Sequence, residues 1–227
     1  MERNGRFGGV WGQVLTGFVA VALLTGCVSA EELRKRVRES DGYYKQGLSS
    51  MDTNQQQAFV SFQKAIQLNP SNYDAHYALG TIQLQRGEYA DAEREFKRCI
   101  ELKPDDGDAL NSYGRTLIKL KRLPEAVVAL RKAVALPLYA TPDVAYLNLH
   151  EALSLQGDYA GAILALQEAL KINPPHIWPA LVYLQLGEMY LKQGDSGRAR
   201  EALVQAQSMD PKGTAGAEAA KLLEQLR

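Results

Sequence analysis

Small and large apolar residues recur at fixed intervals along most of the chain, and the 34 residues from Tyr73 to Asp106 show the pattern most clearly. Gly80 in the first half and Ala92 in the second are small residues on predicted helical faces, where a partner helix can approach closely. Gly87 lies between the halves and can end a helix in the left-handed conformation. Pro104 follows the second half, where it stops a helix without breaking it. The pattern therefore predicts two helices joined by a short turn.

The same unit recurs along the rest of the chain. The predicted copies cover residues 40–72, 73–106, 107–140, 143–176 and 180–213. The position of Gly80 holds glycine in every copy except the fourth, where His150 stands, and we expect this ring to push the two helices of that copy apart. Residues 215–227 follow the last copy and predict a capping helix, because apolar residues recur there at helical spacing.

This spacing resembles one unit of the tetratricopeptide repeat (TPR) family, a pair of antiparallel helices in 34 residues. The residues that carry the resemblance in the second copy are Leu79, Gly80, Gly87, Tyr89, Ala92, Phe96 and Pro104. The resemblance implies an all-α TPR solenoid over residues 40–227, with five helix pairs and a C-terminal capping helix. In such a fold each unit contacts mainly its neighbours.

Residues 1–26 have the pattern of a lipoprotein signal peptide. Arg3 and Arg6 give a weakly positive start, and the apolar run VLTGFVAVALL follows at residues 14–24. The run ends in Leu24-Thr25-Gly26-Cys27, which resembles the bacterial lipobox, where a peptidase cuts before the cysteine and a lipid is attached to its sulfur. The resemblance implies lipidation of Cys27. Val28 in place of aspartate implies sorting to the periplasmic face of the outer membrane.

Two alternatives to the lipid anchor stay open. No charged residue occurs from Phe7 to Ala30, and these 24 residues are long enough to span a membrane as an uncleaved helix. Several glycines dilute this stretch, however, and its dense apolar part is short. The other alternative is a soluble protein without an anchor.

Residues 27–39 are expected to form the lipidated N-terminus and a charged spacer. The sequence Glu31–Ser40, EELRKRVRES, is charged and predicts a helix. Our preferred interpretation is a solvated segment between the lipid and the first repeat. The alternative is a basic contact to lipid head groups through Arg34, Lys35, Arg36 and Arg38.

Composition excludes some partners without naming one. The 227 residues carry 26 Lys and Arg and 26 Asp and Glu, so no basic excess exists to neutralise phosphates, and nucleic acid is not expected as a partner. Cys27 and Cys99 are the two cysteines and could in principle form a disulfide, but Cys27 is expected to carry lipid. Cys99 stands where the other copies have alanine, so we expect a buried small residue.

No pattern of catalytic or metal-binding residues stands out. His76, His150 and His176 lie in different copies, and no group of His, Cys, Asp and Glu has the spacing of metal ligands. The acidic turn at residues 105–108, Asp-Asp-Gly-Asp, lacks the later ligands of a calcium loop, and Asp and Gly are ordinary residues in turns. We therefore expect a protein that is not an enzyme and that has no cofactor, metal or small-molecule substrate.

The concave face of the predicted solenoid is the expected functional surface, and in TPR units the first helix of each pair lines it. The expected lining residues are Tyr44, Leu48, Met51, Tyr77, Thr81 and Leu84 in the first two copies, Asn111, Arg115, Ile118 and Lys119 in the third, and Leu147, Glu151, Leu155, Leu181, Leu184, Glu188 and Leu191 in the last two. Two apolar patches thus flank a basic centre at Arg115 and Lys119, and such a groove suits an amphipathic or extended protein segment. The alternative for each residue is packing against the next repeat.

The TPR class that binds C-terminal carboxylates uses Lys and Asn at two of these positions. Tyr44 and Leu48 do not match it.

The junction after the third copy, residues 135–142, is longer than the other turns. Together with Asn111–Gly114 before it and Ala145–Leu149 after it, it resembles the PilW/PilF family, the TPR lipoproteins of type IV pilus biogenesis. The resemblance implies a pilotin-like assembly factor that binds the pilus secretin and helps it to localise or multimerise at the outer membrane. The alternative is a general periplasmic TPR scaffold that recruits cell-wall, polysaccharide-export or outer-membrane assembly proteins.

Overall fold

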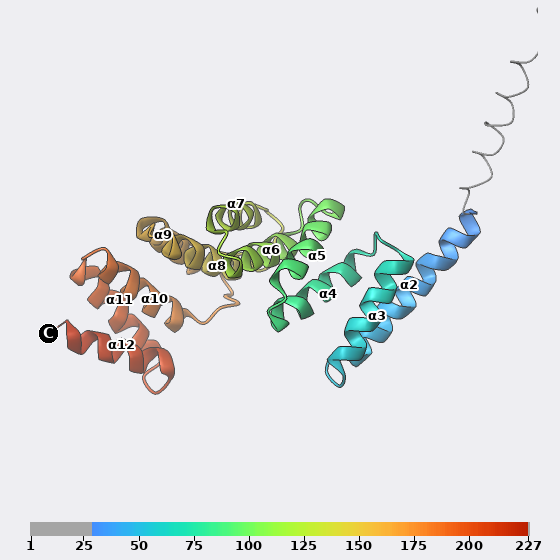
Figure 1. Cartoon of the computed structure of the whole chain (residues 1–227). Coiled ribbons are helices and arrows are strands. Elements are labelled where there is room, and N and C mark those ends of the chain that lie inside the picture. The colour runs from blue at the N-terminus through green and yellow to red at the C-terminus, as the bar shows by residue number, and fades with distance from the viewer. Residues whose placement is uncertain (1–28, 227) are drawn as a thin grey trace, which may run out of the picture.

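The computed structural model describes residues 29–226, and in that range every element is an α-helix (Figure 1). The helices are α2 (Ala30–Ser50), α3 (Gln55–Leu68), α4 (Tyr73–Arg86), α5 (Tyr89–Leu102), α6 (Gly107–Lys119), α7 (Leu123–Val134), α8 (Pro142–Leu155), α9 (Tyr159–Ala169), α10 (Pro179–Lys192), α11 (Ser196–Met209) and α12 (Thr214–Gln225). Short turns join the helices into the pairs α2–α3, α4–α5, α6–α7, α8–α9 and α10–α11. The predicted all-α solenoid of five helix pairs with a final capping helix is confirmed.

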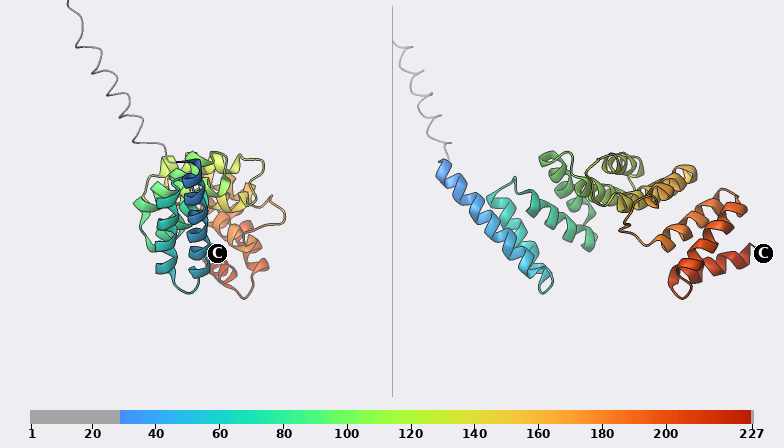
Figure 2. Two further views of the ribbon diagram at one scale, coloured as in Figure 1. Left: turned by 90° about the vertical axis from the view of Figure 1, so that its right-hand side faces the viewer. Right: turned by 180° about the vertical axis from the view of Figure 1, so that it is seen from behind.

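The pairs stack in one direction, with α2 at one end of the molecule and α12 at the other (Figures 1 and 2). We call the first helix of each pair the A-helix and the second the B-helix. A-helices of neighbouring pairs contact each other between α4 and α6 and between α6 and α8, and α10 contacts α12 in the same way; within the described range no two B-helices pack together comparably. The inner side of a curved array is the side on which neighbours lie closer, so the A-helices line the concave face.

Local sequence signals explain where the helices begin and end. Side chains at several helix starts accept a hydrogen bond from a backbone N–H of the first turn, which satisfies a donor that would otherwise lack a partner. These N-caps include Asn54, Asn72, Asp106, Asp158 and Asp195 at the starts of α3, α4, α6, α9 and α11. Gly87 ends α4 with a φ of 77°, a left-handed conformation that favours glycine.

Within a pair, a glycine of the A-helix lies directly under a large side chain of the B-helix. A Cβ atom added to Gly80 would lie 3.1 Å from Phe96 Cε1, and one added to Gly114 would lie 2.5 Å from Leu130 Cγ. Phe96 and Leu130 are fully buried. The glycine thus leaves the space that the large side chain fills, and this contact sets the distance between the two helices.

His150 occupies the equivalent position on α8, and the prediction that it would push α8 and α9 apart is wrong. The two helices pack along each other as the other pairs do. The residue of α9 at the position of Phe96 and Leu130 is Leu166, which is also fully buried, so the histidine ring does not prevent close packing of this pair. His150 itself is only 7% exposed, and its Nε2 atom is buried without a hydrogen-bond partner among the described residues.

The prediction for Cys99 is confirmed. The side chain is fully buried, and its thiol lies 3.7 Å from the carbonyl oxygen of Tyr73. Burial, with a smaller effect of the nearby Glu95 carboxylate, raises the pKa of the thiol to about 12. A thiol that does not ionise near neutral pH is a packing residue and not a reactive one.

The predictions for the N-terminal segment lie partly outside the described residues. The signal peptide and Cys27 are not among residues 29–226. The charged sequence expected as a spacer belongs to α2, which is capped by Ser29 and continues without a break into the first repeat. No helix of the described range is both long and apolar enough to cross a membrane.

Replacing Gly80 by leucine should lower the free energy of unfolding by about 1–3 kcal/mol, because the added side chain overpacks the contact with Phe96. Urea denaturation followed by circular dichroism measures this change. Gly42→Ala is the control, because a Cβ atom there meets nothing within 4 Å, and it should be neutral or slightly stabilising. A Gly80→Leu variant that unfolds like the parent would show that the A/B contact is not tight.

His150 should make the protein less stable in acid. Burial disfavours the charged ring and lowers the pKa of His150 below its usual value. The unfolded chain therefore binds this proton first, and stability falls as the pH drops below about 6.5, the ordinary histidine pKa, until the folded-state pKa is passed. Urea midpoints at pH 7.5 and 5 should drop more for the wild type than for His150→Leu, and parallel pH profiles would contradict this.

Candidate functional site

The groove residues predicted in the first pair divide into packed and exposed side chains. The Tyr44 ring packs against Phe62 with 5.8 Å between centroids, and Met51 lies against the same buried cluster. Leu48 on α2, in contrast, is 47% exposed. Leu48 is therefore available to a partner, while Tyr44 and Met51 also hold the first pair together.

Tyr77 on α4 ties the second pair to the third. Its ring stacks on that of Tyr73, with 6.2 Å between ring centroids and an interplanar angle of 15°. It also contacts the Phe96 ring edge-on, with 5.7 Å between centroids and an angle of 68°. Its hydroxyl lies 3.2 Å from the Ser112 hydroxyl on α6, while Thr81 donates a hydrogen bond to the Tyr77 carbonyl at 2.8 Å. Tyr77, Thr81 and Leu84 are all half-buried. A substitution at Tyr77 would therefore change the solenoid as well as any bound partner.

The centre of the groove is less basic than the sequence suggested. Lys119 Nζ on α6 lies 3.3 Å from Glu151 Oε1 on α8, so this pair cancels much of its own charge. Arg115 is exposed and has no carboxylate partner among residues 29–226. Asn111 accepts a hydrogen bond of 2.7 Å from the Asn148 amide, and Ile118 is buried. Asn111 and Ile118 therefore join repeats instead of facing a ligand.

The C-terminal part of the groove offers leucines and one carboxylate. Leu155 at the end of α8 is 60% exposed and Leu181 on α10 is 38% exposed, whereas Leu184 is buried. Leu147 and Leu191 lie half-buried against the main core.

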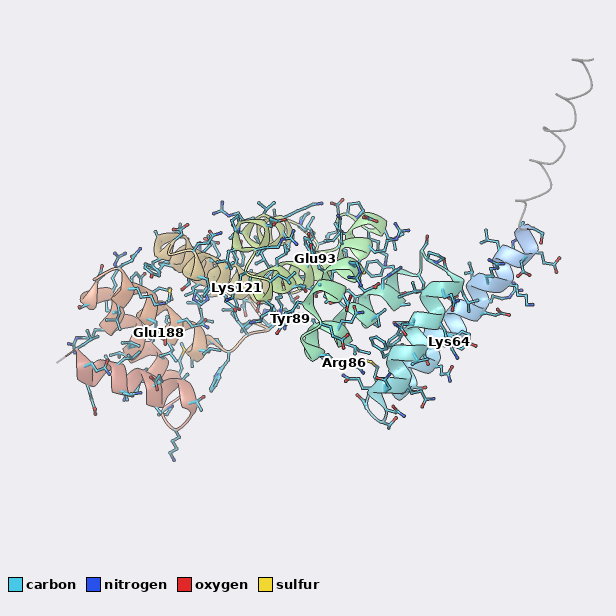
Figure 3. All side chains as sticks on the ribbon, viewed as in Figure 1. Lys64, Arg86, Tyr89, Glu93, Lys121 and Glu188 are labelled. Atoms are coloured by element: carbon cyan, nitrogen blue, oxygen red, sulfur yellow. The ribbon has the colours of Figure 1, made fainter. Side chains whose placement is uncertain are left out.

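Glu188 lies on α10 (Figure 3) and has no ion pair in the described part of the chain. Loss of water raises the pKa of Glu188, with Lys192 opposing the shift and Glu218 of α12 adding to it. A carboxylate held half-buried next to leucines can accept a cation from a partner, because a charge-assisted hydrogen bond would replace the lost water.

Direct packing between neighbouring A-helices is not continuous along the molecule. The A-helices α2 and α4, and likewise α8 and α10, lack the direct packing seen between α6 and α8. The last junction, between α9 and α10, is long and includes Pro174, Pro175 and His176. Asp143 at the start of α8 is fully buried there and accepts hydrogen bonds from the backbone N–H of His176 at 2.5 Å and from its Nδ1 at 3.1 Å.

Neither Asp143 nor the lack of a partner for Glu188 was found from the sequence, because both depend on residues from other repeats.

The first junction is spanned by Arg86, whose guanidinium lies 4.7 Å from the Phe59 ring and 3.2 Å from Gln56 Oε1 (Figure 3). Among residues 29–226 no three His, Cys, Asp or Glu side chains lie close enough to hold a metal ion. The groove thus offers surfaces for a protein segment.

Comparison with protein families identifies the repeats. Three models described as tetratricopeptide repeat match residues 61–94, 83–151 and 143–212. Among curated proteins, the type IV pilus assembly protein PilF of Pseudomonas aeruginosa is 30% identical over 139 residues, which are 58% of this chain and 55% of that protein. Anaphase-promoting complex subunit 3 of Schizosaccharomyces pombe is 27% identical over 115 residues, 51% of this chain and 17% of that protein. The chain spans about half or less of the length of these relatives.

Solved structures give the same result. The crystal structure of PilW, a widely conserved type IV pilus biogenesis factor, superposes with a TM-score of 0.69 at 25% identity and covers 82% of this chain and 86% of that one. The structure of Pseudomonas aeruginosa pilF superposes with a TM-score of 0.68 at 25% identity and covers 84% of this chain and 86% of that one. YrrB, a TPR protein with an unusual peptide-binding site, superposes with a TM-score of 0.66 at 22% identity and covers 85% of this chain and 100% of that one. At this identity the similarity supports the fold alone. The chain is therefore a tetratricopeptide-repeat protein that is similar, at modest identity, to the type IV pilus biogenesis proteins PilF and PilW.

Proposed function

We propose that this protein is an assembly factor of type IV pilus biogenesis that binds a protein partner in its concave groove. The observation that carries the proposal is the similarity to PilW and pilF, which extends over more than four fifths of both chains in each comparison. The partner proposed is the pilus secretin, whose localisation or multimerisation the protein would assist. A lipid on Cys27 would hold the protein at the periplasmic face of the outer membrane.

The exposed leucines of the groove would supply most of the binding energy. Burying a leucine side chain completely contributes about 1.5–3 kcal/mol, and Leu48, Leu155 and Leu181 each have part of that area still exposed. An exposed ion pair such as Lys119–Glu151 contributes about 0–1 kcal/mol. Apolar contacts would therefore set the affinity, while Arg115 and Glu188 would favour one orientation of a charged partner.

A general periplasmic scaffold is the second candidate. It is supported by the similarity of the repeats to proteins outside pilus assembly, such as anaphase-promoting complex subunit 3. Such a scaffold would recruit cell-wall, polysaccharide-export or outer-membrane assembly proteins through the same groove. Co-purification with a secretin and the consequences of deleting the protein in cells would separate the two candidates.

The combined variant Leu48→Asp and Leu155→Asp should weaken partner binding while leaving the fold intact, because both side chains are largely exposed. Expressed in a deletion strain, it should yield less detergent-resistant secretin multimer and fewer surface pili than the wild type. Val128→Asp is the matched control, since Val128 lies on the B-helix α7 and is 70% exposed. Arg115→Ala should have a smaller effect that weakens with salt, because exposed charges act over about 8 Å at physiological ionic strength.

Normal multimers and normal pili in the deletion strain would reject the pilus assignment and leave the general scaffold standing. A defective deletion strain that the groove variant restores fully would keep the assignment and place the binding surface elsewhere. Tyr77 is omitted from the variant because its contacts with Phe96 and Ser112 hold the repeats together.

Changing Cys27 to alanine should release the protein from the membrane or mislocalise it. A single acyl chain binds a membrane with a constant on the order of 10⁴ M⁻¹, and additional chains make the attachment durable. Cell fractionation measures the release, and mass spectrometry of the wild type should find lipid on Cys27. Cys99→Ala is the control, because that thiol is buried within a helix pair. An unmodified Cys27 in the membrane-bound protein would rule out the lipid anchor.

A further inference from the structure

The long junction between α7 and α8 holds one leucine fully in solvent. Leu136 and Tyr139 turn inward and pack against the buried cluster of Leu110, Ala133 and Ala145. The Tyr139 ring lies so close to Gly107 that a Cβ atom added there would overlap it. Leu138, between these two anchors, is 95% exposed. The packing of Leu136 and Tyr139 therefore holds the loop in place, while the side chain of Leu138 buries almost no apolar surface.

An acidic turn faces this loop across a hollow of about 420 Å³. One wall is Leu136–Ala140. The other is Asp105 and Asp106, from the turn between α5 and α6, with Gly107 and Asp108 at the start of α6. The carboxylates are poorly compensated. Lys132 lies 3.8 Å from Asp105, whereas Asp108 has no ion pair in the described range. Partial burial and the charge of Asp106 raise the pKa of Asp108 above its usual range.

We propose that this junction hollow, lined by Asp105–Asp108 and Leu136–Ala140, is a second protein-docking surface for a partner segment in which an apolar side chain is flanked by lysine or arginine. The apolar side chain would enter the hollow and cover Leu138. The flanking cations would meet Asp105 and Asp108 and offset the repulsion between Asp108 and Asp106, so charge complementarity selects this occupant.

Two features of the hollow favour a peptide over a dissolved metal ion as its occupant. The carboxylates do not form a group that could hold a metal ion in the described part of the chain, but they suit the separate cations of a peptide. The wall opposite them is apolar, which a dissolved ion would not require. The hollow is formed by two turns between repeats and the first two residues of α6, and none of its lining residues is among the groove residues, so a partner there does not depend on the assignment to pilus assembly.

The test uses a fluorescein-labelled peptide with a central leucine and phenylalanine flanked by two lysines on each side. A matched peptide carries glutamates in place of the lysines. Fluorescence anisotropy at low and physiological salt should show binding of the lysine peptide, weakening with salt, and little binding of the glutamate peptide. The double variant Asp105→Asn and Asp108→Asn should lower the affinity about fivefold, as the loss of two exposed ion pairs would. Leu138→Ser should also lower it.

Three control variants decide where the peptide binds. Asp52→Asn and Val128→Ser change an exposed carboxylate and an exposed apolar residue elsewhere, and both should bind like the wild type. Glu188→Gln removes the unpaired carboxylate of the groove and should also have no effect. Loss of binding with Glu188→Gln but not with the hollow variants would place the peptide in the groove and overturn the proposal. Absent binding to the wild type, or equal binding of the glutamate peptide, would overturn it as well.

Asp106 is left unchanged in these variants because its side chain accepts a hydrogen bond from the Ala109 N–H at 2.9 Å and caps α6. Circular dichroism should show the same helix content and melting temperature for Leu138→Ser as for the wild type, since the side chain has almost no contacts. Loss of peptide binding together with an unchanged melting temperature is then the expected result.

Discussion

The close contact between the two helices of each pair is the constraint on which the rest of the structure depends. A glycine on the A-helix lets a large side chain of the B-helix reach the helix backbone, as Phe96 does above Gly80 and Leu130 above Gly114. The contact fixes how the helices lie within a pair, so each pair stacks as one body on the next. His150 stands at this position on α8, and α8 still packs along α9 like the other pairs, although the ring's Nε2 atom is buried without a hydrogen-bond partner among residues 29–226.

Contacts between pairs vary more than contacts within them, and they decide the shape of the groove. In the middle of the molecule, Tyr77 reaches Ser112 and Lys119 reaches Glu151, so neighbouring A-helices stay in register. At the last junction, the loop that contains His176 is held by the buried carboxylate of Asp143, and α8 and α10 are not packed directly. A segment bound along the whole groove would therefore cross a junction at which α8 and α10 are joined through α9 and through the loop that Asp143 holds.

The sequence predicted what depends on local signals and missed what depends on the angle between repeats. Gly87 and Pro104 mark helix boundaries through their own backbone preferences, so the helix pairs could be predicted, and the alanines aligned with Cys99 indicated its burial. The exposure of groove residues could not be predicted as well. Ile118 and Leu184 share the repeat positions of half-buried residues such as Leu84 and Tyr77 but are themselves buried. The sequence around Glu188 does not indicate that its carboxylate lacks an ion-pair partner among the described residues. This depends on which side chains α12 brings next to α10.

The exposed apolar residues are informative because the fold does not need them. Leu48 and Leu155 lie on A-helices that are already packed through other faces, and Leu138 lies on a loop already fixed by Tyr139 and Gly107. A solvent-exposed leucine in one place is ordinary, but each of these stands beside a hollow, a groove or an uncompensated charge. Both proposed surfaces belong to one array of stacked repeats, so a partner that occupied one would meet the other at an effective concentration on the order of millimolar if its linker could span them. Two individually weak contacts would then suffice for stable binding, and the spacing of the repeats would select which partners can make both.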